Sequence, residues 1–158
     1  MIFEGKHVVV LEHDGWEYVE RKKGKEAVAV IAMTDDGKLI LTEQYRRPVD
    51  ARVIDWPAGL VGDEGDEGPE ATARKELKEE TGYACERVEL LAKGPTSPGI
   101  TSELVSFYRA HSVTKKGGHE EEITVHTISR DEIREWLADR ERDGVLVDLK
   151  IWGGLYLV

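Results

Sequence analysis

Three glutamates near the middle of the chain have the spacing of a metal-binding helix face. A proline suits the first position and a glycine suits the C-terminal stop, so the pattern predicts one helix over residues 69–81. Glu76, Glu79 and Glu80 then stand at i, i+3 and i+4 and share a face, where like charges repel by roughly 0.2–0.5 kcal/mol per pair. A divalent cation would offset that repulsion, and Mg²⁺ is typically held by one or two carboxylates together with substrate phosphates.

A bare E-x-x-E-E pattern is more often a solvated acidic face, so the surrounding residues decide. The chain resembles the Nudix hydrolase family, whose signature is G-x5-E-x7-R-E-U-x-E-E-x-G-U, where U is apolar. The positions that match are Glu67, Glu76, Leu77, Glu79, Glu80, Gly82 and Tyr83. Lys75 stands where the family has arginine, which replaces a planar fork by a point charge. Seven residues rather than five separate Gly59 from Glu67, a loop extension that costs little entropy.

The resemblance narrows to the ADP-ribose pyrophosphatase-like enzymes and runs from about Trp16 to the C-terminus. Residues 43–48 read EQYRRP, and residues 57–59 supply the P-A-G entrance to the box. Pro98 stands sixteen residues after Gly82, a spacing that accompanies ADP-ribose preference in that group. These segments imply a substrate that is a nucleoside diphosphate sugar.

The resemblance also implies metal ligands. Glu76 and Glu80 match residues that bind Mg²⁺, for which Mn²⁺ is a substitute in such sites. Glu79 is either a further ligand or a partner of the ligands. Glu67 either binds the metal through water or orients the others, and the backbone carbonyl of Ala58 is a further expected ligand.

The general base of the subfamily lies in a loop outside the box. Here that loop is KKGGHEEE, residues 115–122, and alignment on the following strand favours Glu121, with Glu120 and Glu122 as close rivals. Together with Glu79 these residues are the catalytic candidates. Two adjacent glycines predict a loop that closes only over substrate. A solvated acidic turn is an equally good interpretation of any single one of these glutamates.

Substrate recognition requires cations that the acidic box lacks. Arg46 matches a diphosphate-contacting arginine of the relatives, and Arg21 is a second candidate, because guanidinium groups suit phosphate oxygens. Trp16 either stacks on a base or ribose or packs in the fold, as aromatic residues do. Pro98 is expected to shape the distal sugar site, and Trp56 either lines the pocket or fills the core.

Composition limits the class of protein. With 158 residues, 40% of them hydrophobic, we expect one Nudix domain over 1–158. The net charge of −10 argues against binding nucleic acid or anionic membrane. A single cysteine allows no intrachain disulfide, and there is no leader or membrane-spanning run, so we expect a cytoplasmic protein. Residues 1–22 are expected to form a hairpin that contributes to a homodimer.

Hydrophobic patterning predicts an α+β protein with a mixed β-sheet between helices, an α/β/α sandwich, and the resemblance to the Nudix family implies the same fold. We expect hairpins from 7–11 with 16–21 and from 27–33 with 38–44, the strand 27–33 being central. Further strands are expected at 88–92, 104–111 and 123–128. Ser129 and Glu132 form a capping box for a helix, and Asp148 is expected to cap the last helix.

The favoured function is Mg²⁺-dependent hydrolysis of the diphosphate of ADP-ribose or a related nucleoside diphosphate sugar. The alternatives are a Nudix hydrolase that cleanses the pool of nucleoside di- or triphosphates, and a noncatalytic ligand sensor with the same fold. Product analysis over a substrate panel separates them.

Overall fold

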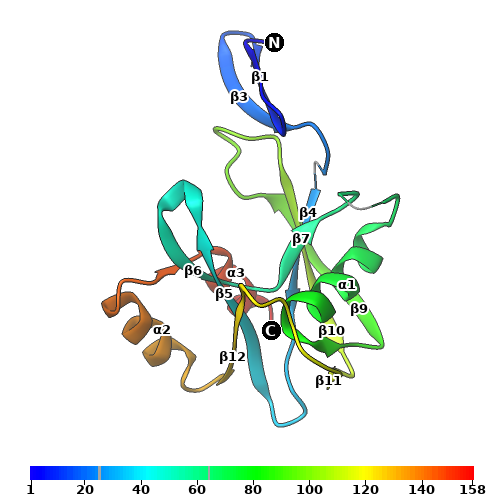
Figure 1. Ribbon diagram of the computed structural model, residues 1–158, viewed down its shortest axis with the longest axis vertical. Coiled ribbons are helices and arrows are strands. Elements are labelled where there is room, and N and C mark those ends of the chain that lie inside the picture. The colour runs from blue at the N-terminus through cyan, green and yellow to red at the C-terminus, as the bar shows by residue number, and fades with distance from the viewer. Residues whose placement is uncertain (25, 64) are drawn as a thin grey trace.

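A strand that is apolar on both faces forms the centre of the structure. The computed structural model describes residues 1–24, 26–63 and 65–158 (Figure 1). In it, β4 (Glu26–Ile31) lies between β7 (Ala58–Leu60) and β10 (Leu104–His111). Val28 and Val30 join one core cluster, whereas Ala29 and Ile31 join another on the opposite face. The prediction of a central strand is therefore confirmed.

Two four-stranded sheets, with the orders β7-β4-β10-β9 and β12-β5-β6-β13, make up the body. The remaining strands of these sheets are β5 (Lys38–Arg46), β6 (Ala51–Asp55), β9 (Arg87–Pro95), β12 (Thr124–Ser129) and β13 (Leu146–Val147). Strand β10 is parallel to β4 and antiparallel to β9, so the first sheet is mixed.

The second predicted hairpin forms only at its tip. Met33 and Leu39 make an isolated bridge, and the N–H of Ile40 donates to the carbonyl of Ala32 at 3.0 Å. Beyond these residues β4 and β5 enter different sheets, because each is paired on both edges with other strands. The prediction of a continuous hairpin was wrong for this reason.

The helices cover the two opposite faces of the centre. They are α1 (Pro69–Thr81), α2 (Ile133–Arg142) and α3 (Lys150–Leu157). Leu77 of α1 packs with Val28 and Val30, whereas Leu137 of α2 and Ile151 of α3 belong to the other cluster. This arrangement is the expected α/β/α sandwich, and the helix bounds 69–81 are confirmed.

The starts of the last two helices differ from each other. Ser129 is the last residue of β12, where it pairs with Lys38, and in the described chain no side chain caps α2. The predicted capping box was therefore wrong, because the strand ladder holds Ser129 in extended backbone. Asp148 does act at the start of α3, where its Oδ1 accepts a hydrogen bond from the N–H of Lys150 at 2.9 Å.

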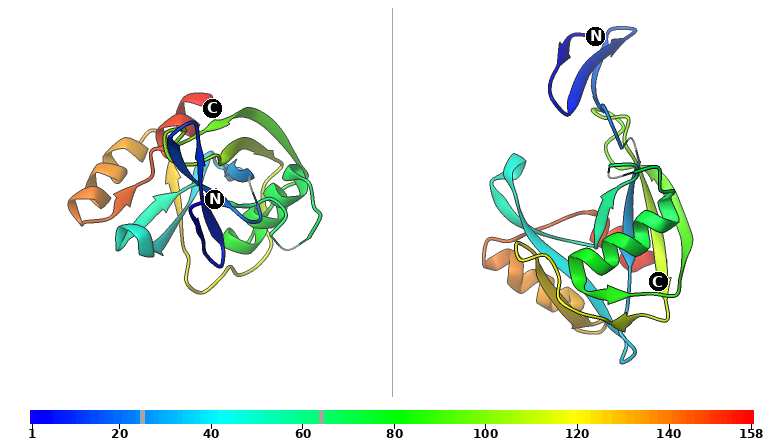
Figure 2. Two further views of the ribbon diagram at one scale, coloured as in Figure 1. Left: turned by 90° about the horizontal axis from the view of Figure 1, so that it is seen from above. Right: turned by 45° about the vertical axis from the view of Figure 1, so that its right-hand side comes forward.

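A small antiparallel sheet stands off from the body at the N-terminus (Figures 1 and 2). It consists of β1 (Phe3–Glu4), β2 (Val8–His13) and β3 (Trp16–Arg21). The predicted hairpin of β2 and β3 is confirmed, with Asp14 and Gly15 at φ 52° and 80° in its tight turn. Strand β1 was not predicted. The sheet meets the body where the N–H of Val19 donates to the carbonyl of Ile100 at 2.8 Å.

Three short elements complete the chain: the 3₁₀ turn η1 (Arg47–Val49), β8 (Tyr83–Ala84) and β11 (Thr114–Lys115). Strands β8 and β11 pair with each other next to the end of α1. None of the helices in the described parts of the chain has the length and apolar character that crossing a membrane requires.

Candidate active site

The glutamates of α1 differ in how deeply they lie. Pro69 starts the helix, and Gly82 ends it at φ 71°, where its N–H donates to the carbonyl of Lys78 at 2.8 Å. Glu80 shares the buried face of the helix and is only 7% exposed, whereas Glu79 is exposed. The glutamates that the spacing places on one helix face therefore differ in burial, with Glu80 in the interior and Glu79 in solvent.

The P-A-G turn meets the end of this helix face. The N–H of Ala58 donates to Glu80 Oε2 at 2.9 Å, and Gln44 Nε2 donates to Glu80 Oε1 at 2.8 Å. Both carboxylate oxygens of Glu80 are thus held by neighbouring strands, β7 and β5. The contact of Ala58 seen here is made through its N–H, and the metal-binding role of its carbonyl stays a prediction.

Glu76 occupies the space that the box glycine leaves open. A Cβ added at Gly59 would lie 2.1 Å from Cδ of Glu76, far inside van der Waals contact. Only glycine therefore accommodates the Glu76 carboxylate in this position. Glu76 and Glu80, which the resemblance marks as metal ligands, both reach the P-A-G turn.

Burial determines the acidity of Glu80. The pKa of Glu80 is raised to about 7, mainly by burial. The neighbouring Glu76 carboxylate also raises it, while hydrogen bonds from Ala58 and Gln44 and the positive charge of Arg46 oppose the rise. A carboxylate of this kind gains from a bound cation, because the cation stabilises the charged form that burial disfavours.

The donor set fits a divalent cation that retains water. Among the residues that the structure describes, no three Asp, Glu, His or Cys side chains already form a complete metal site. Mg²⁺ does not need one, because one or two carboxylates together with waters and substrate phosphates suffice. Glu76 and Glu80 supply such a pair of carboxylates at the P-A-G turn.

Glu67 lies near Glu76. Both residues line a cavity of about 60 Å³, together with Asp63 and Lys75. Glu67 itself is exposed. The structure therefore brings the predicted upstream glutamate, the first glutamate of the box that is a predicted ligand, and the lysine that replaces the family arginine to one cavity.

The loop of residues 115–122 is anchored on the carboxyl end of α1. Its N–H groups and one ammonium satisfy carbonyls that the helix end leaves without partners. The bonds run from Lys116 N to Gly82 O at 2.8 Å, from Glu120 N to Glu79 O at 3.1 Å, and from Lys115 Nζ to Thr81 O at 2.8 Å. The ammonium of Lys115 also lies 4.5 Å from the ring centroid of Tyr83.

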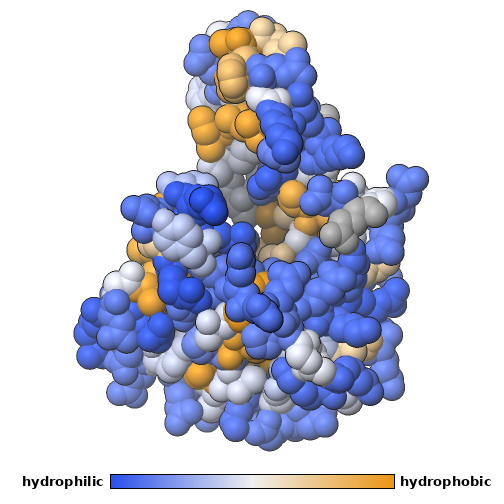
Figure 3. All heavy atoms as spheres, in the orientation of Figure 1, coloured by the Kyte–Doolittle hydropathy of each residue, from blue (hydrophilic) through white to orange (hydrophobic). Residues whose placement is uncertain are grey.

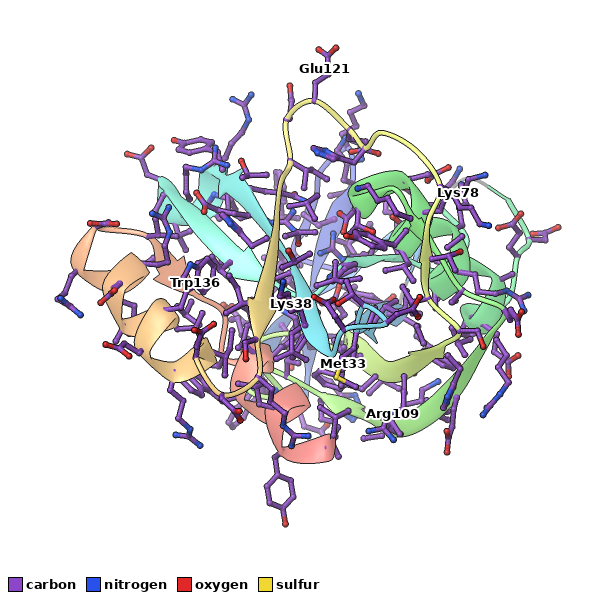
Figure 4. All side chains as sticks on the ribbon, turned by 90° about the horizontal axis from the view of Figure 1, so that it is seen from below. Met33, Lys38, Lys78, Arg109, Glu121 and Trp136 are labelled. Carbon is purple, nitrogen blue, oxygen red and sulfur yellow. The ribbon has the colours of Figure 1, made fainter. Side chains whose placement is uncertain are left out.

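The first two glutamates of the run in this loop lie differently. The backbone of Glu120 is hydrogen-bonded to α1, whereas Figure 4 shows Glu121 at the outer tip of the loop, with its side chain directed away from the body. The paired glycines pack against Gly82, where a Cβ would lie 2.3 Å from the carbonyl oxygen of Gly117. Which glutamate is the base stays a prediction.

The predicted substrate residues fall into two groups. Arg46 ends β5 and lies near enough to Glu80 to lower the pKa of that carboxyl group. Trp16, Arg21 and Pro98 gather instead where β3 meets the loop between β9 and β10. Trp16 Nε1 donates to the carbonyl of Gly99 at 3.2 Å, and Arg21 Nε lies 2.5 Å from Glu103 Oε2. Figure 3 shows the surface hollowed between the β5–β6 corner, the box loop and the N-terminal sheet.

Two buried acids support the strands that carry the site. Asp55 accepts from the N–H of Trp56 at 2.8 Å and lies 2.9 Å from Lys150 Nζ. The pKa of Asp55 is raised to about 6, mainly by burial; Lys150 opposes the rise, and the nearby Asp148 carboxylate adds to it. Trp56 is 1% exposed and donates to the Lys150 carbonyl, so it fills the core rather than lining a pocket.

The second acid, Glu43, precedes Gln44 on β5 and is 3% exposed. It is 2.5 Å from Arg52 Nε, 2.8 Å from His126 Nε2 and 3.1 Å from Arg140. Burial alone would raise the pKa of Glu43, but these hydrogen bonds outweigh it, and the pKa is lowered.

Two contacts of the site were missed by sequence reasoning. Gln44 could have been found from strand alternation, because it stands two residues before Arg46 on the same face of β5. Lys115 had no comparable signal, because its bond to Thr81 joins segments that are distant in the sequence.

Known proteins share both the sequence and the fold. The model of the NUDIX domain matches residues 23–148. The chain is 41% identical over 122 residues to a methanol dehydrogenase activator of Bacillus methanolicus, which covers 73% of this chain and 64% of that protein. It is 37% identical over 123 residues to an ADP-ribose pyrophosphatase of Bacillus subtilis (strain 168), which covers 72% of this chain and 63% of that protein. A crystal structure of an ADP compounds hydrolase superposes with a TM-score of 0.70 at 22% identity, covering 95% of this chain and 81% of that one.

The chain belongs to the Nudix family. The fold agrees with this family: as expected, the helix that carries the box glutamates packs on a mixed sheet. The matched region spans just under two thirds of the length of the two relatives. Members of the family generally use divalent metal ions.

Proposed function

We propose that this chain hydrolyses the diphosphate bond of ADP-ribose or a related nucleoside diphosphate sugar with the help of Mg²⁺. The products are a nucleoside monophosphate and a sugar phosphate. The observation that carries the proposal is the convergence of Glu76 and Glu80 on the P-A-G turn, with Glu80 buried and held by two hydrogen bonds. The relative named ADP-ribose pyrophosphatase supports this substrate class.

Glu76 and Glu80 hold the metal in this proposal, and Glu79, Glu67 and the carbonyl of Ala58 complete or orient the site. Bound Mg²⁺ lowers the pKa of a water and stabilises charge on the diphosphate oxygens. The water oxygen bonds to one phosphorus, the bond from that phosphorus to the bridging oxygen breaks, and the bridging oxygen leaves on the other phosphate.

The proton of the attacking water goes to a glutamate of the loop. Glu121 is the residue that alignment favours, and Glu120 is its rival. The anchored backbone of Glu120 favours Glu120 in the conformation described, whereas Glu121 would have to turn inward from the loop tip. Replacing each by glutamine and comparing the pH dependence of kcat distinguishes the two.

In this proposal the two groups of predicted substrate residues contact different ends of the ligand. Arg46 contacts the diphosphate, and its proximity to Glu80 supports the role. Trp16 and Pro98 contact the rest of the ligand, and the support for this is that both lie where β3 meets the loop between β9 and β10. Arg21 is already paired with Glu103, so it contributes less than Arg46.

The N-terminal sheet has the surface of an interface. Ile2, Phe3 and Trp16 are each more than half exposed, and Figure 3 shows apolar side chains on this sheet. We propose that residues 1–22 belong to the one domain of the chain and contribute to a homodimer, and that the protein acts in the cytoplasm without binding nucleic acid. Light scattering that gives a monomer for the full chain would contradict the dimer.

A substrate panel tests the function. ADP-ribose, other nucleoside diphosphate sugars and free nucleotides are incubated with Mg²⁺ or Mn²⁺, and the products are separated. Glu80→Gln and Glu76→Gln should each reduce kcat/KM by at least about 10–100-fold, the range for perturbing metal coordination. Glu70→Gln is the matched control, because Glu70 is exposed in the first turn of the same helix.

The alternatives predict other outcomes of the same panel. Preferred hydrolysis of nucleoside di- or triphosphates would identify a pool-cleansing enzyme instead. Binding of ADP-ribose with no turnover, unchanged by Glu80→Gln, would identify a ligand sensor and refute the proposal.

A further inference from the structure

A second cavity opens on the lower face of the body, away from the N-terminal sheet. It has a volume of about 380 Å³ and lies between Met33 and Arg109, which Figure 4 labels on this face. Pockets for small molecules generally measure about 300–1,000 Å³, so the cavity can take a small ligand. None of the residues that line it belongs to the metal site described above.

The cavity lies where two neighbouring parallel strands end. Strands β4 and β10 are in register up to Ile31 and Arg109; β4 ends there, whereas β10 continues for two residues along β9, to His111. The space beyond the carboxyl ends of parallel strands is the usual ligand position in open α/β sheets, because loops diverge there and leave a crevice.

The polar groups of the cavity are suited to a phosphate. Arg109 is partly buried, and its side chain makes no hydrogen bond or ion pair with any residue in the described parts of the chain. Its neighbour His111 is already 2.9 Å from Glu89. The guanidinium of Arg109 is therefore available, and bidentate contact with phosphate oxygens is a favoured use of such a group.

The backbone beside Arg109 is strained. Ser112 lines the cavity and adopts φ 55°, in the left-handed region that residues other than glycine rarely occupy. Such a conformation costs on the order of 1–3 kcal/mol and persists mainly where the surroundings hold it for a purpose. It leaves an exposed hydroxyl at the cavity.

The remaining lining suits a sugar. Asp35 is exposed at the cavity, and its carboxylate can accept hydrogen bonds from sugar hydroxyls. Ile31, Met33 and Val113 supply an apolar wall for the carbon face of the ring. An isolated inorganic phosphate would use Arg109 but would be repelled by Asp35, so the lining favours a phosphate attached to a polyol.

We propose that this cavity is a second ligand site that binds a small sugar phosphate. Arg109 contacts the phosphate, Asp35 accepts hydrogen bonds from the sugar hydroxyls, and Met33 packs on the ring. The chemistry of recognition does not depend on the reaction proposed above, although a sugar phosphate is one of the two products of that reaction.

The methionines of the chain provide a specific reporter. There are two, Met1 at the N-terminus and Met33 in the cavity, so methyl-labelled methionine gives two NMR signals that are easily assigned. The full chain, without metal, is titrated with ribose 5-phosphate, with ribose and with inorganic phosphate. We expect a saturable shift of the Met33 signal with ribose 5-phosphate and no shift of the Met1 signal.

Variants separate this site from the metal site. Arg109→Gln should weaken ribose 5-phosphate binding by about tenfold or more, as expected for loss of a charged hydrogen-bonded pair. Arg87→Gln, a neighbouring exposed arginine on β9 that does not line the cavity, should leave binding unchanged, as should Glu80→Gln. Asp35→Asn should weaken ribose 5-phosphate but not inorganic phosphate.

Four results would overturn the proposal. The first three are a Met33 signal that does not move at about 10 mM ligand, equal affinity in wild type and Arg109→Gln, and binding of inorganic phosphate as tight as that of ribose 5-phosphate. Loss of binding in Glu80→Gln would also overturn it, because the ligand would then occupy the metal site. An inactive wild-type enzyme that still shifts Met33 would refute the proposed function and leave this site standing.

Discussion

Replacing Gly59 with alanine would place a methyl group where the Glu76 carboxylate lies. The added Cβ would stand 2.1 Å from Cδ of Glu76, whereas carbon atoms in contact lie about 3.5–4.0 Å apart. The carboxylate must therefore move by at least about 1.5 Å. Because a misplacement of about 1 Å at a reacting centre can cost about 100-fold in rate, we expect kcat/KM to fall by about that factor.

The fold should tolerate this change. Glu76 is a flexible side chain that can rotate away, and alanine is favoured over glycine by roughly 0.5–1 kcal/mol in regular structure. The assay combines kcat/KM for ADP-ribose, a Mg²⁺ titration and thermal unfolding. Gly94→Ala is the matched control, since a Cβ at Gly94 in β9 meets nothing within 4 Å. Wild-type activity and Mg²⁺ dependence in Gly59→Ala would refute the assignment of Glu76 as a ligand.

Lys115→Met removes the hydrogen bond to the Thr81 carbonyl, so kcat should fall by about tenfold while metal affinity stays unchanged. Lys115→Arg should restore kcat. An unaltered kcat in the methionine variant would contradict the anchoring role. Gln44→Ala leaves the Glu80 carboxylate with one hydrogen-bond donor fewer, so calorimetry should show Mg²⁺ binding weakened by about tenfold. Equal Mg²⁺ affinity in the wild type and the variant would count against a role for this contact. The pKa of Asp55 is raised from 3.8 to about 6, so the native state holds the proton more tightly than the unfolded chain. The free energy of unfolding should therefore fall by up to about 3 kcal/mol between about pH 4 and pH 6. Urea unfolding of Asp55→Asn should lack this slope, and an unchanged slope would show that another group titrates.

The local sequence was sufficient to predict an element where that element contains its own start, stop and hydrophobic pattern. The helix 69–81 begins at a proline and ends at a glycine in left-handed backbone, and the predicted bounds of strand 104–111 match those of β10. The pairing of β4 with β5 could not be predicted in the same way. A tight turn between two apolar runs favours a hairpin locally, but β10 and β7 compete for the edges of β4, and β12 and β6 for those of β5.

The same limit applies to the candidate site. Helical spacing placed Glu76, Glu79 and Glu80 on one face, yet it could not show that Glu80 is buried while Glu79 is exposed. That difference arises because the P-A-G turn packs over the end of the helix face, which is a contact between segments about twenty residues apart. The anchoring of the loop through Lys115 is of the same non-local kind.

The position of Glu80 depends on a network on the far side of β5. Adjacent residues of a strand point to opposite faces. The contacts that hold the Glu43 side chain on one face of β5 therefore also keep the Gln44 side chain directed to the other face, toward Glu80. Glu43 is held by three positively charged or hydrogen-bonding groups, including His126 of β12 and Arg140 of α2. Such buried networks are rigid when their members are satisfied, and removing one partner leaves a buried charge uncompensated. A change at Arg140 should therefore reach Glu80 through β5, although Arg140 belongs to a helix on the other face of the sandwich.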